Sequence, residues 1–383
     1  MCSIAHEAHT QHPVPGLSAI DLAFDAKGQL WRASVKDDFL LVDKSSDLGK
    51  TFSQAMMVNT TPQNIGASNE ARPHIAVDNK GHLYVSWTQN LGTRFAGYIW
   101  FARSLDGGKS FEKPFIVHQD RAEITHAFNT LDVGPDGKII VSWIDKRDAV
   151  AAKKASQTYA GAAIYYAVST DHGQTFQTER KLTDASCECC RIATTHEPDG
   201  TVVALWRHIF EGGERDHMMA ELPLDKSPAK LQRATFGHWK IDGCPHHGGA
   251  LATGGEGKDW WGYHLAYFDG NDKKPGLYYS RMDGVAWASS VPKKFGNNAH
   301  RAGHPALLSQ GEKVWLVWRE TEAKRHTIYG MMSDDGGRSW HAAKLLVSAE
   351  GKVDYPQLLG RNGQSYLLWN TAHEGLKVVV LEQ

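Results

Sequence analysis

Cysteines and histidines are concentrated in two short stretches of this chain. Four of its five cysteines lie in Cys187-Glu188-Cys189-Cys190-Arg191 and Cys244-Pro245-His246-His247. Thiolate sulfur and imidazole nitrogen together suit soft or borderline metal ions such as copper and zinc. The paired CxxC spacing of zinc ribbons is absent, so the prediction depends on composition and position. The predicted metal ligands are Cys187, Cys189, Cys190, Cys244, His246 and His247.

Further histidines stand near the starts of other apolar segments. We treat His74, His126 and His304 as secondary metal ligands. A smaller cysteine and histidine tract between Cys2 and His12 indicates the same chemistry. We favour copper, with zinc as the alternative, because cysteine is combined with abundant histidine. Metal binding would depend on pH, since thiols and imidazoles must lose protons to become ligands.

The same cysteines allow a purely structural interpretation. A disulfide between Cys244 and one of Cys187, Cys189 or Cys190 would staple two neighbouring units in an oxidising compartment. This bridge would use two of the four cysteines, so it is compatible with a metal site. Buried, reduced thiols are a third possibility.

A repeated turn indicates the architecture that positions these loops. The eight-residue pattern Ser-x-Asp-x-Gly-x-Thr/Ser-aromatic occurs four times, and a fifth copy is decayed. Asp can accept hydrogen bonds from the backbone of a tight turn, and Gly adopts backbone angles that other residues resist. The good copies begin at Ser45, Ser104, Ser169 and Ser333, and the decayed copy begins at Ser280.

A second repeat consists of two apolar strands, joined by an Asp/Gly turn and ending in an aromatic residue. These aromatic residues recur about every 56 residues, a period that fits a propeller blade. They are Trp31, Trp87, Trp143, Trp206, Tyr267, Trp318 and Trp369. We therefore predict an all-β fold, a β-propeller with seven blades (six as the alternative) and with the eight-residue turns between outer strands.

The predicted domain organisation is one propeller over residues 17–383, preceded by an N-terminal segment of residues 1–16. This segment could complete the last blade, which would remove exposed sheet edges. In a propeller, the loops that lead into the innermost strands open on one end of the central channel. We call this end the mouth, and we expect the cysteine and histidine loops to converge there.

The turns and strand repeats resemble the Asp-box (BNR) repeats of sialidases over nearly the whole chain. Sialidases use three arginines, a tyrosine nucleophile with a glutamate partner, and an aspartate acid/base. The resemblance therefore implies an exo-α-sialidase as an alternative function, although the cysteine cluster has no place in that mechanism. The candidate arginines and tyrosine are Arg72, Arg191, Arg301 and Tyr355, with Glu188 and Asp354 for the acids.

A closer resemblance concerns the cysteine loops. Cys-Glu-Cys-Cys-Arg followed by Gly243-Cys244-Pro245 is similar to a group of bacterial extracytoplasmic sialidase-like proteins. That similarity implies a periplasmic or extracellular location. Cys2 followed by Ser3 would also suit a lipoprotein processing site, although the N-terminus lacks the basic and apolar regions of a signal peptide.

Composition excludes some partners. Lys and Arg total 42 and Asp and Glu total 43, a net charge of −1, which does not suggest a nucleic-acid partner or an anionic membrane. No apolar run approaches the roughly 20 residues of a transmembrane helix. Three hypotheses follow: a metal-binding propeller, a sialidase-type glycoside hydrolase, and a non-catalytic propeller, stapled by disulfides, that binds a carbohydrate or a protein.

Overall fold

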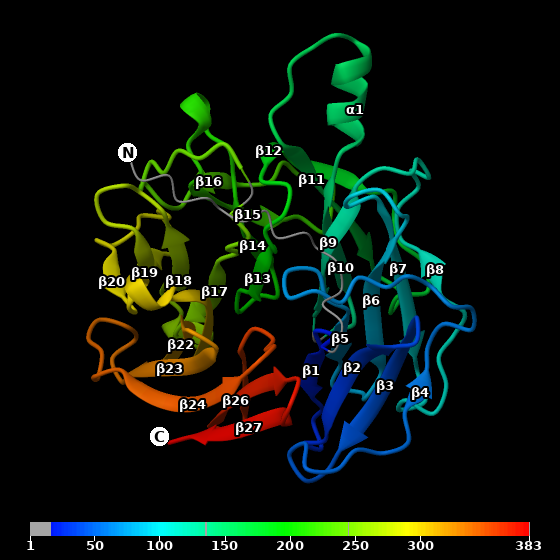
Figure 1. The fold of residues 1–383 in the computed structure, drawn as a ribbon. Helices are drawn as coiled ribbons and strands as arrows, with labels where there is room; N and C mark the ends of the chain where they lie inside the picture. Colours follow the sequence, from blue (N-terminus) through cyan, green and yellow to red (C-terminus); the bar gives the residue numbers. More distant parts are fainter. Residues whose placement is uncertain (1–16, 135, 244, 383) are drawn as a thin grey trace.

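The chain folds into seven antiparallel sheets arranged around a central axis (Figure 1). The computed structural model describes residues 17–134, 136–243 and 245–382. Within these residues, six sheets have four strands and the last has three. The fold is a seven-bladed β-propeller, which confirms the predicted fold class and makes the six-bladed alternative wrong.

Each blade is a meander in which consecutive strands are hydrogen-bonded neighbours. The first blade contains β1 (Asp21–Phe24), β2 (Leu30–Lys36), β3 (Phe39–Ser45) and β4 (Met56–Met57). The second contains β5 (His74–Val77), β6 (Leu83–Asn90), β7 (Gly97–Ser104) and β8 (Phe115–Ile116). The third contains β9 (His126–Val133), β10 (Ile139–Asp145), β11 (Ala162–Ser169) and β12 (Arg180–Ser186).

The remaining blades follow the same order. The fourth contains β13 (Ala193–His196), β14 (Val202–Arg207), β15 (His217–Leu222) and β16 (Leu231–Arg233). The fifth contains β17 (Ala250–Gly254), β18 (Gly262–Asp269), β19 (Gly276–Asp283) and β20 (Lys293–Phe295). The sixth contains β21 (Gly303–Gln310), β22 (Lys313–Glu322), β23 (Arg325–Ser333) and β24 (Lys344–Glu350). The seventh contains β25 (Gln357–Arg361), β26 (Gln364–Thr371) and β27 (Gly375–Leu381).

The repeated aromatic residues lie within the second strands of the blades and fill the space between blades. Trp87, Trp143 and Trp369 are each 0% exposed. The apolar clusters combine residues of adjacent blades, as where Tyr84 of β6 packs with Trp143 of β10. Truncating one such tryptophan to alanine would cost about 3–5 kcal/mol, because a large cavity would remain. The repeat of aromatic residues in the sequence is therefore the repeat of blade-to-blade packing.

The four good copies of the eight-residue turn share one hydrogen-bond pattern. In the copy at Ser169, Asp171 accepts hydrogen bonds from the Ser169 hydroxyl, the Thr175 backbone N–H and the Thr175 hydroxyl. In the first copy, hydrogen bonds from Thr51 and then Ser45 lower the pKa of Asp47 to about 2. The copies join the third and fourth strands of their blades, so they lie on the face opposite the mouth. We call this the turn face.

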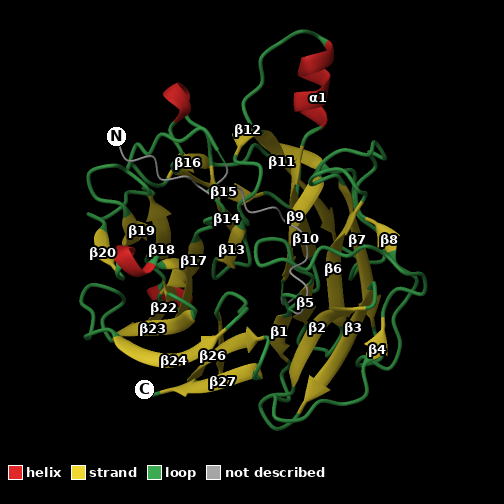
Figure 2. Ribbon diagram, in the orientation of Figure 1, coloured by secondary structure: helices red, strands yellow, loops and turns green. Residues whose placement is uncertain are grey.

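Helices contribute little to the fold (Figure 2). The single described α-helix, α1 (Arg147–Lys154), lies between β10 and β11, buries none of its residues and stands away from the blades. Short 3-10 turns occur at η1 (Glu211–Gly213), η2 (Gly257–Asp259) and η3 (Asn298–His300). Among the described residues, no helix has the length and apolar character needed to cross a membrane.

Side-chain hydrogen bonds join the first and last blades of the ring. Asn370 donates to the carbonyl of Ser18 at 3.1 Å, and Gln357 donates to the carbonyl of Ile20 at 2.7 Å. The Ile20 N–H in turn donates to Asp354 at 3.2 Å. The predicted completion of the last blade by residues 1–16, and the predicted roles of Cys2 and the N-terminal histidines, lie outside the described residues.

Candidate functional site

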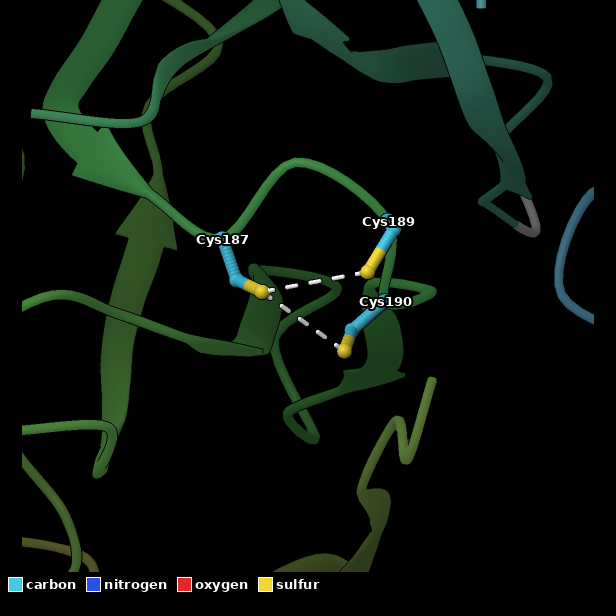
Figure 3. A group of neighbouring side chains, drawn as sticks. All are labelled: Cys187, Cys189 and Cys190. Atoms are coloured by element: carbon cyan, nitrogen blue, oxygen red, sulfur yellow. Dashed lines mark hydrogen bonds between the residues drawn. The ribbon is translucent and has the colours of Figure 1, made fainter. Parts of the chain in front are cut away.

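Three cysteine thiols meet in the loop between β12 and β13, which leads into the innermost strand of the fourth blade (Figure 3). The Sγ atom of Cys187 lies 4.0 Å from that of Cys189 and 3.9 Å from that of Cys190. The three side chains are 1%, 0% and 2% exposed, respectively. No disulfide joins them to one another, because a bonded pair of sulfurs is about 2.05 Å apart. The predicted bridge to Cys244 lies outside the described residues.

The chain on either side holds this loop in place. The Cys187 N–H donates to the carbonyl of Arg207 at 2.9 Å, which ties the start of the loop to the end of β14. At the other end, the Arg191 N–H donates to Glu70 Oε2 at 2.7 Å. The first anchor joins two backbone groups, and the second joins the backbone to the buried Glu70 carboxylate, so the loop is fixed at both ends.

A buried cation and a buried imidazole lie close to the thiols. Arg207 is 1% exposed, and its guanidinium donates to the carbonyls of Arg215, His247 and Phe268. Among the described residues, no carboxylate forms an ion pair with it. His217 stands opposite Arg207 in the β14–β15 register, is 0% exposed, and its Nε2 has no hydrogen-bond partner in the described part of the chain.

The electrostatics of the cluster favour neutral groups when no metal is bound. The hydrogen bond to Cys187, followed by burial, raises the pKa of the Cys190 thiol well above its usual value, and Arg207 opposes this shift. Burial and then Arg207 hold the pKa of His217 well below its usual range, whereas Cys187 acts in the opposite direction. A metal ion would therefore have to displace the proton from the Cys190 thiol, whereas His217 already has its nitrogen lone pair available.

The two histidines of the second predicted loop occupy different surroundings. Burial lowers the pKa of His246, while Glu70, Cys187 and the backbone of Cys189 act to raise it, so this side chain lies against the cysteine loop. His247 stacks between Phe268 and His304, with ring centroids 4.3 and 5.0 Å away. The structure therefore brings His246 to the thiols and directs His247 toward the far side of the mouth.

Arginines and carboxylates occupy that far side. Arg72 forms an ion pair with Asp354 at 2.7 Å, and Asp354 is 0% exposed. Arg191 reaches Glu70 Oε1 at 3.3 Å and the Pro305 carbonyl at 3.1 Å. Because these pairs join loops of the second, fourth, sixth and seventh blades, they draw the loops together across the channel.

Tyr355 lies at the centre of this arginine-rich side. Its ring stacks on His304 at 3.7 Å, and the guanidinium groups of Arg191 and Arg319 lie 5.5 and 5.3 Å from it. Burial and then Glu70 raise the pKa of Tyr355, although Arg319, Arg191 and Arg72 act to lower it. The phenol is therefore held in its protonated form.

The side chains of the other predicted residues make their contacts outside both groups. His74 Nδ1 lies 3.6 Å from Asp21 Oδ2 on the innermost strands. His126 stacks on His118 at 4.1 Å and bonds the Gly97 carbonyl through Nδ1. Arg301 is exposed after η3, and Glu188 is paired with Lys146 at 2.6 Å.

The structure adds four residues that the sequence did not indicate: Glu70, Arg207, His217 and Arg319. Arg207 and Arg319 each follow the repeated aromatic residue in the second strand of a blade, Trp206 and Trp318. This shared position is the signal that could have found them, because it directs both guanidinium groups toward the mouth. Glu70 and His217 have no comparable sequence pattern.

Comparison with known proteins reaches only the fold. No family model and no curated protein matches the chain. Among solved structures, an ulvan lyase of polysaccharide lyase family 25 has a TM-score of 0.55 at 11% identity, over 94% of this chain and 90% of that one. The Hadza microbial sialidase Hz136 has a TM-score of 0.53 at 15% identity, over 92% of this chain and 73% of that one.

An α-L-arabinofuranosidase of Fusarium graminearum gives a similar result. Its TM-score is 0.53 at 12% identity, over 81% of this chain and 89% of that one. Because proteins with different activities share this fold at such low identity, the likeness establishes a sialidase-like propeller and no activity.

Proposed function

We propose that this protein binds a soft metal ion, copper(I) before zinc, through the thiolates of Cys187, Cys189 and Cys190. The observation that carries the proposal is the spacing of the sulfurs, 4.0 and 3.9 Å from Cys187. An ion about 2.3 Å from each sulfur separates them by about 3.8 Å in tetrahedral geometry and about 4.0 Å in trigonal geometry. Binding would therefore require little movement of the loop.

The buried Arg207 supports an anionic complex at this point. A cation buried without a carboxylate partner is costly, and three thiolates around a monovalent ion carry a net charge of −2. Arg207 acts to lower the pKa of Cys190 against the larger effects that raise it, so its positive charge favours the thiolate there. The chain thus already contains a counter-charge for a metal-thiolate centre.

Copper(I) is preferred to zinc because the described ligands are soft. Thiolates select copper(I), whereas carboxylates and water suit harder ions. His217 and His246 are the nearest described imidazoles, and either could add a fourth ligand for zinc. We keep the periplasmic or extracellular location that the cysteine signature implies.

Metal titration tests the proposal. The reduced protein is titrated with copper(I) against a chromophoric chelator, and with zinc(II) in a separate experiment. We expect one tightly bound copper(I) ion per chain, and no tight binding by Cys187→Ser/Cys189→Ser/Cys190→Ser. Arg301→Gln is the matched control, because Arg301 is exposed beside the sixth-blade loop. Equal affinity of the triple variant and the wild type for both metals would overturn the proposal.

A glycan ligand is the second candidate function, and Arg319 is the observation that favours it. Burial lowers the pKa of this arginine, its Nε has no partner among the described residues, and it faces Tyr355. An anionic sugar would satisfy this cation. The names of the similar solved structures, a sialidase, an arabinofuranosidase and an ulvan lyase, are consistent with a carbohydrate ligand.

Binding and cleavage can be separated experimentally. Fluorogenic sialosides and arabinofuranosides measure hydrolysis, and calorimetry with free sialic acid measures binding. Hydrolysis abolished by Tyr355→Phe would support the sialidase alternative. Binding without hydrolysis would support the non-catalytic propeller, and neither signal in the wild type would exclude a ligand of this kind.

A further inference from the structure

A second group of potential metal ligands lies on the turn face, between the second and third blades. One oxygen of Asp78 and one nitrogen each of His82 and His172 lie within 4.8 Å of one another. Asp78 and His82 belong to the turn between β5 and β6, whereas His172 belongs to the turn between β11 and β12. The group shares no residue with the mouth and bridges two blades.

Asp78 is fixed by its own turn. Its Oδ1 accepts the backbone N–H groups of Lys80 and His82, both at 2.9 Å. Its Oδ2 accepts the Tyr84 hydroxyl at 3.0 Å and lies 2.9 Å from His82 Nδ1. The carboxylate is buried, while the His82 side chain is 21% exposed, so solvent reaches the group from one side.

His172 is held in place by its backbone, and a space beside the neighbouring turn accommodates its ring. Arg103 donates to the carbonyl of His172 at 2.9 Å. A Cβ at Gly137 would collide with the ring, so the neighbouring turn leaves space for it. His172 Nδ1 is buried and has no hydrogen-bond partner in the described part of the chain. The rings of His82 and His172 meet edge to face, with centroids 6.0 Å apart.

The junction between the first and second blades shows that the turn does not require histidine. There Asp25 Oδ1 accepts the N–H groups of Lys27 and Gln29 at 2.9 and 2.8 Å, and Oδ2 accepts Trp31 Nε1 at 3.0 Å. Gln29 stands where His82 stands, and Gly107 stands where His172 stands in the eight-residue pattern. The turn and its hydrogen bonds therefore form without imidazoles.

The backbone makes the histidine at position 172 unfavourable. His172 has φ 56°, and the same position is held by Gly107 (φ 73°) and Gly336 (φ 64°) in two other copies and by Leu48 (φ 58°) in a third. A side chain with a Cβ costs roughly 1 kcal/mol in this region, so glycine would be more stable. A residue that is strained and also leaves a buried nitrogen without a partner is what a ligand site would produce.

We propose that Asp78, His82 and His172 bind a divalent transition-metal ion of the zinc type. One carboxylate oxygen and two imidazole nitrogens are a ligand set for zinc, which leaves a fourth position for water. Ligand atoms about 2.0–2.2 Å from a tetrahedral ion lie about 3.3–3.6 Å apart. The three atoms lie within 4.8 Å of one another, so a small movement of the rings would bring them to these separations. The ion would clamp the second blade to the third.

The test replaces the two histidines by the residues that stand at the equivalent positions of the junction between the first and second blades. In the Cys187→Ser/Cys189→Ser/Cys190→Ser background, which removes the thiols, zinc(II) and cobalt(II) affinities are measured with and without His82→Gln/His172→Gly. We expect one cobalt(II) ion with visible d–d bands and no thiolate charge-transfer band. We also expect the added substitutions to weaken affinity at least 100-fold, and zinc to raise Tm only in the chain that keeps both histidines.

Gln and Gly occur at the equivalent positions of the first junction, so the double variant should fold. His341→Gln is the matched control, since this histidine pairs with Asp334 at 2.7 Å beside another copy of the turn. Unchanged zinc affinity of His82→Gln/His172→Gly, or an equal loss in the control, would overturn the proposal. Failure of the thiol site would not affect this result, because the thiols are already absent.

Discussion

The two sides of the channel mouth satisfy their polar groups in different ways. On the arginine side, Arg72 pairs with Asp354 and Arg191 pairs with Glu70, so most charges are matched within the chain. On the thiol side, Arg207 is bonded only to carbonyls and His217 Nε2 has no hydrogen-bond partner among the described residues. The presence of charged groups therefore does not by itself identify a ligand site. The informative residues are those whose bonding the protein leaves incomplete.

The largest expected effect concerns the paired side. Asp354→Asn should reduce the free energy of unfolding by about 3–5 kcal/mol, because it leaves Arg72 buried without a counter-charge. Urea unfolding measures this change. Glu312→Gln breaks an exposed pair with Arg338 and should cost less than about 1 kcal/mol. Similar losses of unfolding free energy in the two variants would contradict a stabilising role for the ion pairs of the arginine side.

The next effect concerns the thiols. Each single substitution, Cys187→Ser, Cys189→Ser or Cys190→Ser, should weaken copper(I) affinity on the order of 100-fold, because one of three ligands is lost. Chelator competition measures the affinity, and thermal melting checks the fold. Asp354→Asn should leave the affinity unchanged in the protein that remains folded. A loss confined to one cysteine would contradict a three-thiolate centre.

Removing the positive charge of Arg207 should have a smaller effect on copper(I) affinity. Arg207→Met should weaken copper(I) binding roughly 10-fold, since the buried positive charge next to the thiolates is removed. Arg207→Lys keeps the charge and should retain most of the affinity in the same titration. If the lysine variant binds as weakly as the methionine variant, the arginine acts through its hydrogen bonds and its charge has no role.

The pH dependence of stability probes the histidines between the two sides. Burial, followed by Arg207 and Arg319, lowers the pKa of His247 to about 3. The unfolded chain binds this proton below its ordinary pKa of about 6.5, whereas the folded chain does not, so stability falls as pH decreases from about 6.5 to 3. Because of this residue, the free energy of unfolding should fall by about 1.4 kcal/mol for each pH unit of decrease in that window. His247→Gln should flatten the slope in urea unfolding, while an unchanged slope would contradict a neutral, buried His247.

The fold could be read from the sequence because its signals are local and repeated. The repeated aromatic residues and the eight-residue turns each report on one blade, and seven repeats produced seven sheets. Cys187, Cys189 and Cys190 were also predictable as a group, because they lie within four residues of chain. The short helix α1 gave no signal, since it is only eight residues long and none of its residues is buried.

Site residues were harder to predict where the direction of a side chain depends on its surroundings. Arg301 was expected at the mouth, but it caps η3 in a left-handed conformation and is exposed. Arg319 occupies the space beside Tyr355 instead. His126 packs on His118, a residue of the preceding blade with no distinctive pattern of its own. These outcomes depend on packing between blades, which a linear pattern does not contain.

The propeller class, the favoured count of seven blades and the loops that carry the thiols could all be inferred from the sequence. These properties follow from short-range rules: strand alternation, turn chemistry and a packing residue repeated once per blade. Which polar groups are left without partners among the described residues depends on how the blades pack together. Closing the ring brings Glu70 to Arg191, Arg207 to the thiols, and His172 to Asp78, across separations that no local pattern encodes. Burial then removes the water that would otherwise satisfy Arg207 and His217.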